Sequence, residues 1–326
     1  MALIGYHASH EQFSPRDLLE YVQLAEAAGF DAAMCSDHFH PWSREQGNAA
    51  FAWSWLGAAL QATGLSFGTV NAPGYRYHPA IIAQAAATLA DMYPGRFWLA
   101  VGSGESLNES ITGERWPPKY ERNARLKECV DVMRALWAGE TVNHHGRVTV
   151  EQATLYTRPA EPPLVVGAAI TAETAGWMAG WADALITIAQ DEATIREVVR
   201  AWRDGGGAGK PMYLQAFMSW ADTKEDALRV AHEQWRVTLL GSSVLAELRL
   251  PEHFEAAAEF IQPADVDDKM RVSADLEQHL DWLRGDLEHG FERIYLHSVN
   301  PDQPRFIRAF AENVLPALRR QPAATR

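Results

Sequence analysis

Two histidines, an aspartate and a tryptophan lie close together near the start of the chain, in the stretch DHFHPW at 37–42. Imidazole titrates near neutrality, so a histidine here could act as a general base beside an aromatic wall. Alternatively, His38 and His40 are spaced so that both imidazoles could bind one divalent metal from an extended segment. The stretch follows an apolar run, which places it directly after a predicted strand.

A metal centre would need further ligands from the ends of other strands, and the sequence offers few. The predicted strands 163–169 and 183–189 end in VGAA and TIA, without a histidine or a carboxylate. A lone His-x-His pair is a weak signal. Acid-base chemistry without a metal is therefore favoured, and a metal-dependent barrel hydrolase stays as an alternative.

Composition narrows the range of partners and compartments. The 326 residues carry a formal net charge of -13, which argues against nucleic acid or an anionic membrane as the main partner. Cys35 and Cys129 are the two cysteines, too few for a disulfide scaffold, so we expect free thiols in a reducing compartment. The chain shows no secretory leader pattern and no apolar run long enough to span a membrane, so we expect a cytoplasmic protein.

Strand-like and helical runs alternate along the whole chain. The predicted strands are 2–8, 30–36, 65–70, 96–103, 163–169, 183–189, 212–220 and 292–299. Helical sequence follows each of them; in 14–29, for example, Ser14 can cap the helix, Pro15 suits its first turn and Gly29 ends it. A β-hairpin with its turn near Gly146 and a helical insertion at about 224–272 interrupt the series.

Eight such units predict a parallel sheet closed into a (β/α)8 barrel. We expect one α/β domain over residues 1–320, with 321–326 as a flexible tail. A doubly wound open sheet is the competing arrangement. The first βα turn lacks G-x-G-x-x-G, however, and no G-x-x-x-x-G-K-[ST] occurs anywhere in the chain.

In a barrel the carboxyl ends of all strands meet at one face, where the chemistry takes place. The polar or aromatic residues expected there are His7, Ser9, Glu11, Asp37, His38, His40, Trp42, Thr69, Asn71, Ser103, Glu105, Asn108, Thr187, His297 and Asn300. Any one of them could be an ordinary loop residue, but their convergence from several strands indicates a site. Glu105 follows Ser103 and Gly104, whose small side chains let a ligand approach the backbone.

Several stretches, agreeing in order and spacing, resemble the bacterial luciferase-like family of flavin and deazaflavin oxidoreductases. They are GYHASHEQF (5–13), SDHFHPW (36–42), RYHPAIIAQAAATL (76–89), VGSGESLNE (101–109), ERNARLKECVDVMRALWAGE (121–140) and FIRAFAENVLPALRR (306–320). Within that family the chain is similar to the branch of the deazaflavin-dependent glucose-6-phosphate dehydrogenases. The resemblance runs over nearly the whole length and also supports the barrel.

The resemblance implies a role for each matching residue. His38 would be the general base, Trp42 would pack beside the reactive ring atom, and Glu105 would serve the far edge of the ring as proton donor or charge partner. The implied cofactor-binding residues are Asp37, Thr69, Val70, Asn71, Ser103, Gly104, Asn108 and Ala169. Those implied for the substrate pocket are His7, Glu11, His40 and His297. In the family, the segment matching 69–71 often carries a non-proline cis peptide bond.

The chain departs from the sugar-phosphate branch after the predicted strand 183–189. Gln190 and Asp191 stand where that branch has a phosphate-gripping lysine, and a carboxylate there would repel a phosphate monoester. We therefore expect hydride transfer between FMN or coenzyme F-420 and a small organic molecule other than glucose 6-phosphate. The choice of cofactor stays open.

An FMN-dependent monooxygenase is the alternative within the family, and its partner would be a separate flavin reductase. For either enzyme we expect a small-molecule substrate and a homodimer, without nucleic acid or membrane as a partner.

Overall fold

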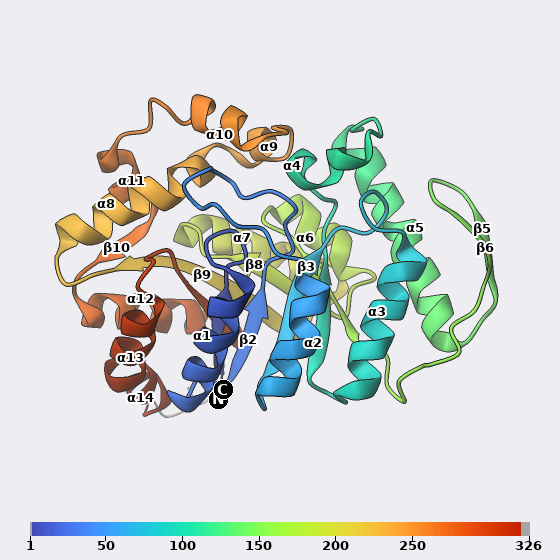
Figure 1. The fold of residues 1–326 in the computed structure, drawn as a ribbon, viewed down its shortest axis with the longest axis horizontal. Helices are drawn as coiled ribbons and strands as arrows, with labels where there is room; N and C mark the ends of the chain where they lie inside the picture. The colour runs from blue at the N-terminus through green and yellow to red at the C-terminus, as the bar shows by residue number, and fades with distance from the viewer. Residues whose placement is uncertain (1, 321–326) are drawn as a thin grey trace.

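The computed structural model describes residues 2–320 and shows a parallel β-barrel surrounded by helices (Figure 1). The barrel strands are β1 (Leu3–Ala8), β2 (Ala32–Cys35), β3 (Ser66–Asn71), β4 (Phe97–Val101), β7 (Leu164–Ala168), β8 (Ala184–Ile188), β9 (Met212–Trp220) and β11 (Arg293–Ser298). Neighbours in this order pair in parallel, and β11 pairs with β1 to close the ring. The predicted barrel is confirmed. The tail predicted at 321–326 lies outside the described residues.

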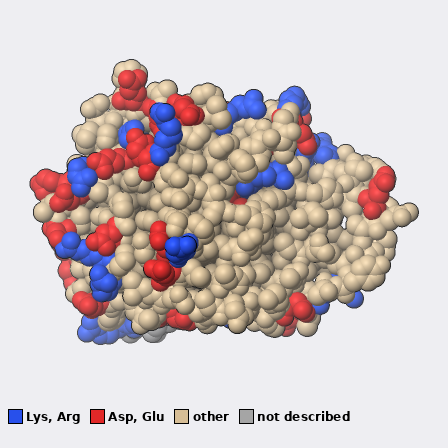
Figure 2. Space-filling view, in the orientation of Figure 1, with Lys and Arg blue, Asp and Glu red and all other residues tan. Residues whose placement is uncertain are grey.

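Helices follow the strands as the sequence predicted. Those around the barrel are α1 (Pro15–Ala27), α2 (Ala52–Ala62), α3 (Pro79–Met92), α5 (Lys119–Ala138), α6 (Ala172–Ala179), α7 (Glu192–Trp202), α12 (Leu276–Glu288), α13 (Gln303–Asn313) and α14 (Leu315–Arg319). The short helix α4 (Ser106–Glu109) follows β4, and the predicted hairpin is β5 (Val142–His145) with β6 (Thr149–Ala153). Figure 2 shows few charged side chains over α2 and α3, which contain a single charged residue, Asp91.

Helix α1 begins and ends where its sequence signals place it. The Ser14 hydroxyl accepts a hydrogen bond from the backbone N–H of Asp17, and Pro15 occupies the first turn. Gly29 follows the last turn with φ of 94°, a left-handed conformation that glycine adopts without steric cost. The chain can therefore turn sharply into β2, and the loop after β2 is brought to the carboxyl face of the barrel.

The barrel interior is filled by large rings that need glycine opposite them. A Cβ on Gly5 would lie 2.4 Å from the ring of Tyr295, and one on Gly68 would lie 1.9 Å from the ring of Trp98. Trp98 and Tyr295 are buried with their centroids 5.6 Å apart. This part of the barrel is therefore a packed core, and open space for a ligand begins above it.

The predicted insertion forms a helical cap at the carboxyl face. It contains α8 (Lys224–Trp235), α9 (Ser242–Leu245), α10 (Pro251–Ala257) and α11 (Pro263–Lys269). The sequence did not predict the short strand β10 (Arg271–Ser273), which pairs with β9 beyond the ring. Trp42, from the loop after β2, and Leu107, from α4, belong to the same apolar cluster as the cap residues Trp235 and Phe254. The cap is thus joined to the predicted site through Trp42.

Two expectations about covalent structure have different outcomes. Cys35 and Cys129 are buried and unpaired, as predicted, and burial raises the pKa of the Cys129 thiol to about 12. The cis peptide bond expected at 69–71 is wrong, since every peptide bond within residues 2–320 is trans. Val70 and Asn71 continue the regular ladder with β4, which a trans chain satisfies without the added energy of a cis bond.

Candidate active site

One large cavity, of about 1370 Å³, opens at the carboxyl ends of the barrel strands beneath the cap. The predicted residues that line it are His7, Glu11, Asp37, His38, Trp42, Val70, Asn71, Ser103, Gly104, Glu105, Asn108, Ala169 and His297. They come from β1, β2, β3, β4, β7 and β11 and from the loops that follow these strands. The structure therefore brings together most of the residues that the sequence singled out.

Thr69 and His40 are corrections, because neither lines the cavity. The Thr69 hydroxyl donates to the backbone carbonyl of Cys35 at 3.1 Å and is fully buried between strands. The His40 ring donates through Nδ1 to the carbonyl of Leu107 at 2.8 Å. Successive side chains of a strand point to opposite faces, so Thr69 faces away from the cavity that Val70 lines. His40 lies in an irregular loop, where its contact with Leu107 sets the direction of its ring.

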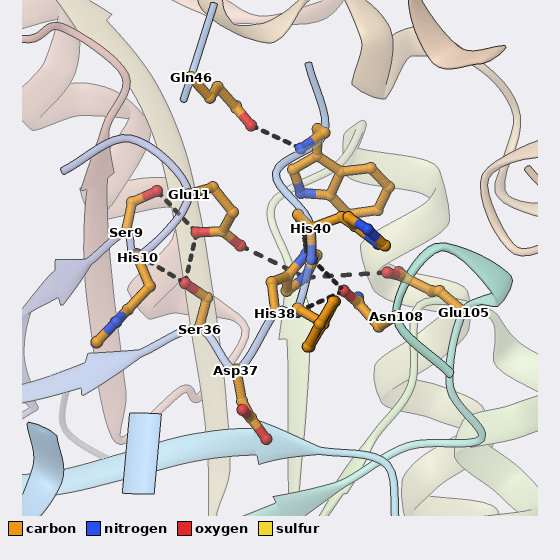
Figure 3. Close-up of polar contacts among 12 residues, drawn as sticks. Ser9, His10, Glu11, Ser36, Asp37, His38, His40, Gln46, Glu105 and Asn108 are labelled. Atoms are coloured by element: carbon orange, nitrogen blue, oxygen red, sulfur yellow. Dashed lines mark hydrogen bonds and ion pairs between the residues drawn. The ribbon is translucent and has the colours of Figure 1, made fainter. Parts of the chain in front are cut away.

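His38 presents one basic nitrogen to the cavity. Its Nδ1 lies 3.2 Å from the carbonyl oxygen of His40, which can only accept a hydrogen bond, so Nδ1 carries the proton of the neutral ring. Nε2 then holds the lone pair. It lies 3.4 Å from Glu11 Oε1 and 3.9 Å from Glu105 Oε2 (Figure 3). A proton taken up at Nε2 would lie between these two carboxyl groups.

Glu11 is a buried anion behind the histidine. The hydroxyls of Ser9 and Ser36 both donate to its Oε2, at 3.0 and 2.5 Å. Burial by itself would raise the pKa of Glu11, but His38 and the Ser36 hydroxyl outweigh it, and the pKa lies below its ordinary value. Glu11 therefore stays ionised and can balance a positive charge on the imidazole.

Glu105 has the opposite tendency. It comes from the loop after β4, at the start of α4, and its side chain is 34% exposed toward the cavity. Desolvation within the cavity raises its pKa, and the charge of Glu11 adds to this effect, although His38 opposes it. The two carboxyls beside His38 thus differ: the pKa of Glu11 is lowered, and that of Glu105 is raised. Such a pair suits a site that needs both a base and an acid.

Trp42 forms an aromatic wall between His38 and the cap. Its ring centroid lies 5.1 Å from that of His38 and 5.3 Å from that of Phe254 in α10. Its backbone N–H donates to the side chain of Gln46 at 2.9 Å, which orients the loop. The indole therefore borders the cavity on one side and is part of the core of the cap on the other.

Asp37 does not point toward the base. Figure 3 shows its carboxylate directed away from His38. Asn71 Nδ2 donates to it at 2.7 Å and the Tyr77 hydroxyl at 3.0 Å, while Arg76 lies at 3.5 Å. With its side chain fully buried and these donors in place, Asp37 anchors the loop that carries His38.

Asn108 joins the two loops of the site. Its Oδ1 accepts hydrogen bonds from the backbone N–H groups of Phe39 and His40, at 2.9 and 3.3 Å. Together with the His40–Leu107 contact, this holds the loop after β2 against α4. Asn108, expected to bind a cofactor, borders the cavity while its carbonyl oxygen serves this structural link.

His7 and His297 stack at the base of the cavity with ring centroids 4.1 Å apart. Burial lowers the pKa of His7 well below its ordinary value and that of His297 to about 3, so both rings are neutral. Gln215 bonds to Nδ1 of His297 at 3.0 Å. These rings give the cavity a polar but uncharged floor.

The chain is similar to proteins of a known family. A family model described as luciferase-like monooxygenase matches residues 2–293. The chain belongs to the luciferase-like monooxygenase family. This confirms the resemblance predicted from the sequence and, at the level of the family, the expectation of a flavin-type oxidoreductase.

Individual relatives of this luciferase-like chain cover nearly its whole length. The F420-dependent glucose-6-phosphate dehydrogenase of Nakamurella multipartita is 37% identical over 328 residues, covering 97% of this chain and 96% of that protein. A solved F420-dependent secondary alcohol dehydrogenase, in complex with an F420-acetone adduct, matches with a TM-score of 0.89 and 31% identity over 97% of this chain and 99% of that one. The oxygenating constituent of 3,6-diketocamphane monooxygenase from Pseudomonas putida, in complex with FMN, shares the fold at 17% identity, with a TM-score of 0.70 over 97% and 98% of the two chains.

The luciferase-like family implies a flavin or deazaflavin ring, and the cavity fits one. The residues that line one part of the wall have little side-chain bulk: Gly102, Ser103, Gly104, Ala168 and Ala169. A Cβ on Gly102 would lie 3.8 Å from that of Ala168. Within residues 2–320, the buried Asn71 Oδ1 and Thr187 Oγ1 have no hydrogen-bond partner, and both residues line the cavity. Such atoms can pair with the polar edge of a bound ring.

Several residues that line the cavity were not predicted from the sequence. They are Ser36, Arg76, Glu109, Lys119, Gln215, Phe217, Trp235, Lys269 and Met270. Ser36 and Arg76 stand within quoted motifs and could have been noticed by their polarity. Trp235, Lys269 and Met270 belong to the cap, whose placement over the barrel no local signal predicts.

Two negative observations apply to the described part of the chain. No group of three or more His, Cys, Asp and Glu side chains within residues 2–320 is arranged to hold a metal ion. No helix in this same range is both long enough and apolar enough to cross a membrane.

Proposed function

We propose that the chain is a dehydrogenase that moves hydride between coenzyme F-420 and a small secondary alcohol or its ketone. The observation that carries the proposal is His38 Nε2, a defined basic atom in the cavity between Glu11, whose pKa is lowered, and Glu105, whose pKa is raised. The relatives above 30% identity are named F420-dependent, which supports the deazaflavin over FMN.

Each residue of the site has a separate role in the proposed alcohol oxidation. A flavin-type ring, when bound, supplies the position that accepts or returns the hydride. His38 Nε2 takes the proton of the substrate hydroxyl, and Glu11 at 3.4 Å balances the resulting positive charge. Glu105, 3.9 Å from the same nitrogen and with a raised pKa, would serve as the proton donor. Trp42 and the cap exclude water from the reacting groups.

Asn71, Ser103, Asn108, Ala169 and Thr187 would hold the cofactor, because they line the cavity on the side of β3, β4, β7 and β8. The substrate would lie toward Phe217, Trp235, His297 and Met270, which line it on the side of β9, β11 and the cap.

The substrate we propose carries no phosphate. Asp191 accepts from the Thr194 hydroxyl and backbone at the start of α7, and these contacts lower its pKa, so it stays anionic. The cap does supply cations that the sequence analysis missed. Lys269 pairs with Asp268 at 2.9 Å, however, and Arg271 forms a double contact with Asp286 at 2.5 and 2.7 Å. A phosphate would have to compete with these carboxylates and with Asp191.

Titration of the purified protein with coenzyme F-420 and with FMN, followed by absorbance, tests the proposal. We expect saturable binding of coenzyme F-420 and its reduction by secondary alcohols. Binding of FMN alone, with oxygen consumption in the presence of a flavin reductase, would favour the monooxygenase instead. Stoichiometric zinc or manganese in the purified protein, without affinity for either ring, would favour the hydrolase.

Glucose 6-phosphate should be a poor substrate. A missing charge-assisted contact to phosphate typically costs about 1.5–3 kcal/mol, or one to two powers of ten in affinity. Initial rates with glucose 6-phosphate and with small secondary alcohols give the comparison. Saturable turnover at low micromolar glucose 6-phosphate would contradict the proposed substrate class.

Glu105→Gln should remove one limb of the pH profile. Because its pKa is raised, the Glu105 carboxyl is protonated at low pH and loses its proton as the pH rises through that value. Wild-type activity in the direction that needs this proton should fall over the same interval, whereas the variant should be about ten-fold slower and flat there. A falling limb that persists in Glu105→Gln would assign it to another group.

A further inference from the structure

We propose that Arg76 is a positioning residue, which holds the loop carrying His38 and the loop carrying Glu105 at a fixed separation by binding Asp37 and Glu109. Neither the family match nor the names of the relatives assigns a role to this side chain. The inference deepens the proposed function, since it concerns how the base and the acid of that site are kept together.

Arg76 comes from the loop between β3 and α3, and its side chain is only 8% exposed. Its Nη2 donates to the backbone carbonyl of Asp37 at 2.8 Å and lies 3.5 Å from the Asp37 carboxylate. Its Nε lies 3.6 Å from Glu109 Oε1, and its backbone N–H donates to Glu109 Oε2 at 2.9 Å. One guanidinium therefore bridges two buried carboxyls from different loops.

The contact between Arg76 and Asp37 positions the backbone that carries His38. Asp37 directly precedes His38, and its carboxylate also receives hydrogen bonds from Asn71 and Tyr77. Because Arg76 binds the backbone of Asp37 as well as its carboxylate, it fixes the chain at the residue before His38. A shift of Asp37 would move Nε2 relative to its partners.

The contact between Arg76 and Glu109 positions the backbone that carries Glu105. Glu109 donates its backbone N–H to the carbonyl of Glu105 at 3.0 Å, within the single turn of α4. Gly104 has φ of 80°, and a Cβ there would lie only 2.9 Å from Cγ of Glu109. The Glu109 side chain thus lies directly against the backbone that leads into Glu105. Holding Glu109 in place also holds that backbone.

A cation is needed at this position because the two carboxyls that it bridges are buried. Burial raises the pKa of Glu109 to about 7 despite the charge of Arg76. Without the guanidinium, the Asp37 carboxylate would lose its positive partner, and Glu109 would lose its contacts to Nε and its counter-charge. The Asn108 and His40 contacts would still join the two loops, but the backbone at Asp37 and the side chain of Glu109 would lose this anchor. We therefore expect the separation of 3.9 Å between His38 Nε2 and Glu105 Oε2 to vary more without the bridge.

A second arginine, which contacts the same loop from α5, offers a matched control. Arg125 in α5 donates to the carbonyl of Gly74 at 2.8 Å and covers the ring of Tyr75. It therefore supports the 72–77 loop from outside, without touching Asp37 or Glu109. Arg125→Met should weaken the loop while leaving the bridge intact.

Coupling between His38 and Glu105 can be measured without substrate or cofactor, from the titration of the His38 ring by NMR. The other titratable groups around His38 are Glu11, His7 and His10. In the Arg125→Met background, Glu105→Gln should lower the titration midpoint of His38 by at least about half a pH unit, because a carboxyl that can ionise when His38 takes up a proton is replaced by an amide that cannot. In the Arg76→Met background the same change should have less than half that effect. An equal shift in both backgrounds would overturn the proposal.

Kinetics provide the second readout. Arg76→Met should lower kcat by about 20-fold or more with KM changed less than three-fold, Arg76→Lys should recover part of the loss, and Arg125→Met should stay within three-fold of wild type. In the Arg76→Met background, Glu105→Gln should then lower kcat only slightly further. If the losses in kcat from the two substitutions multiply, as they do for independent sites, the proposal is contradicted.

If Arg76→Met does not fold, Arg76→Lys takes its place in both cycles, with a smaller expected loss of coupling. If the NMR coupling behaves as expected while no alcohol is oxidised, the bridge stands and the proposed substrate class fails.

Discussion

His38→Ala should lower turnover by about a hundred-fold or more, the usual scale of general base catalysis, while cofactor affinity changes little. The structure makes this loss specific to one atom. Nδ1 is occupied by the carbonyl of His40, so Nε2 is the nitrogen that can accept the substrate proton. Steady-state rates with a secondary alcohol, together with absorbance titration of the cofactor, measure the two effects separately.

His40→Ala is the matched control for this prediction. Its ring bonds to the carbonyl of Leu107 and does not line the cavity, so its loss should loosen the loop and reduce turnover by only a few-fold. A metal centre built on both histidines would behave differently. Equal losses in the two variants, with metal measured in the wild type and absent from both, would overturn the redox assignment.

Glu11→Gln should produce the second large loss, of about 30-fold in kcat. The amide keeps the size of the side chain but removes the charge that balances a protonated His38 at 3.4 Å. The hydroxyls of Ser9 and Ser36 donate to Glu11 Oε2, so at least one would have to reorient if the amide nitrogen took that position. Comparison of kcat and KM with wild type measures the loss.

Glu11→Gln should also change how stability depends on pH. The pKa of Glu11 is depressed in the folded protein, so its ionised form contributes stability that is present above the unfolded pKa and is lost as the pH falls through the folded value. Thermal unfolding of wild type and variant should therefore differ most at neutral pH and converge in acid. Unchanged turnover combined with identical unfolding curves would remove Glu11 from the mechanism.

The amino-acid sequence by itself determined the barrel and the end of it that carries the site. Buried strands alternating with capped helices specify a parallel arrangement, because each helix must return the chain to the same end of the sheet. The signals are local, as at Ser14 and Gly29 of α1, so they could be read without knowledge of distant contacts. The positions of Glu11, His38 and Glu105 after their strands follow from the same regularity.

Only the tertiary structure decided which way the loop side chains point. Asp37 turns away from the base because Asn71, Arg76 and Tyr77, more than thirty residues further along the chain, bind its carboxylate. His40 turns to Leu107 for a similar reason. Irregular backbone has no fixed period, so the direction of a side chain in a loop depends on whichever partners folding brings near it.

The placement of the cap over the barrel also could not be predicted from the sequence. Its helices could be predicted at 224–272, but the contact of Phe254 with Trp42 and the arrival of Lys269 beside the loop after β8 could not. These contacts join segments more than seventy residues apart, and they are fixed by apolar packing and charge pairing between surfaces that no local pattern describes. The sequence by itself thus determined the residues available for chemistry, and packing between distant segments decided which of them meet.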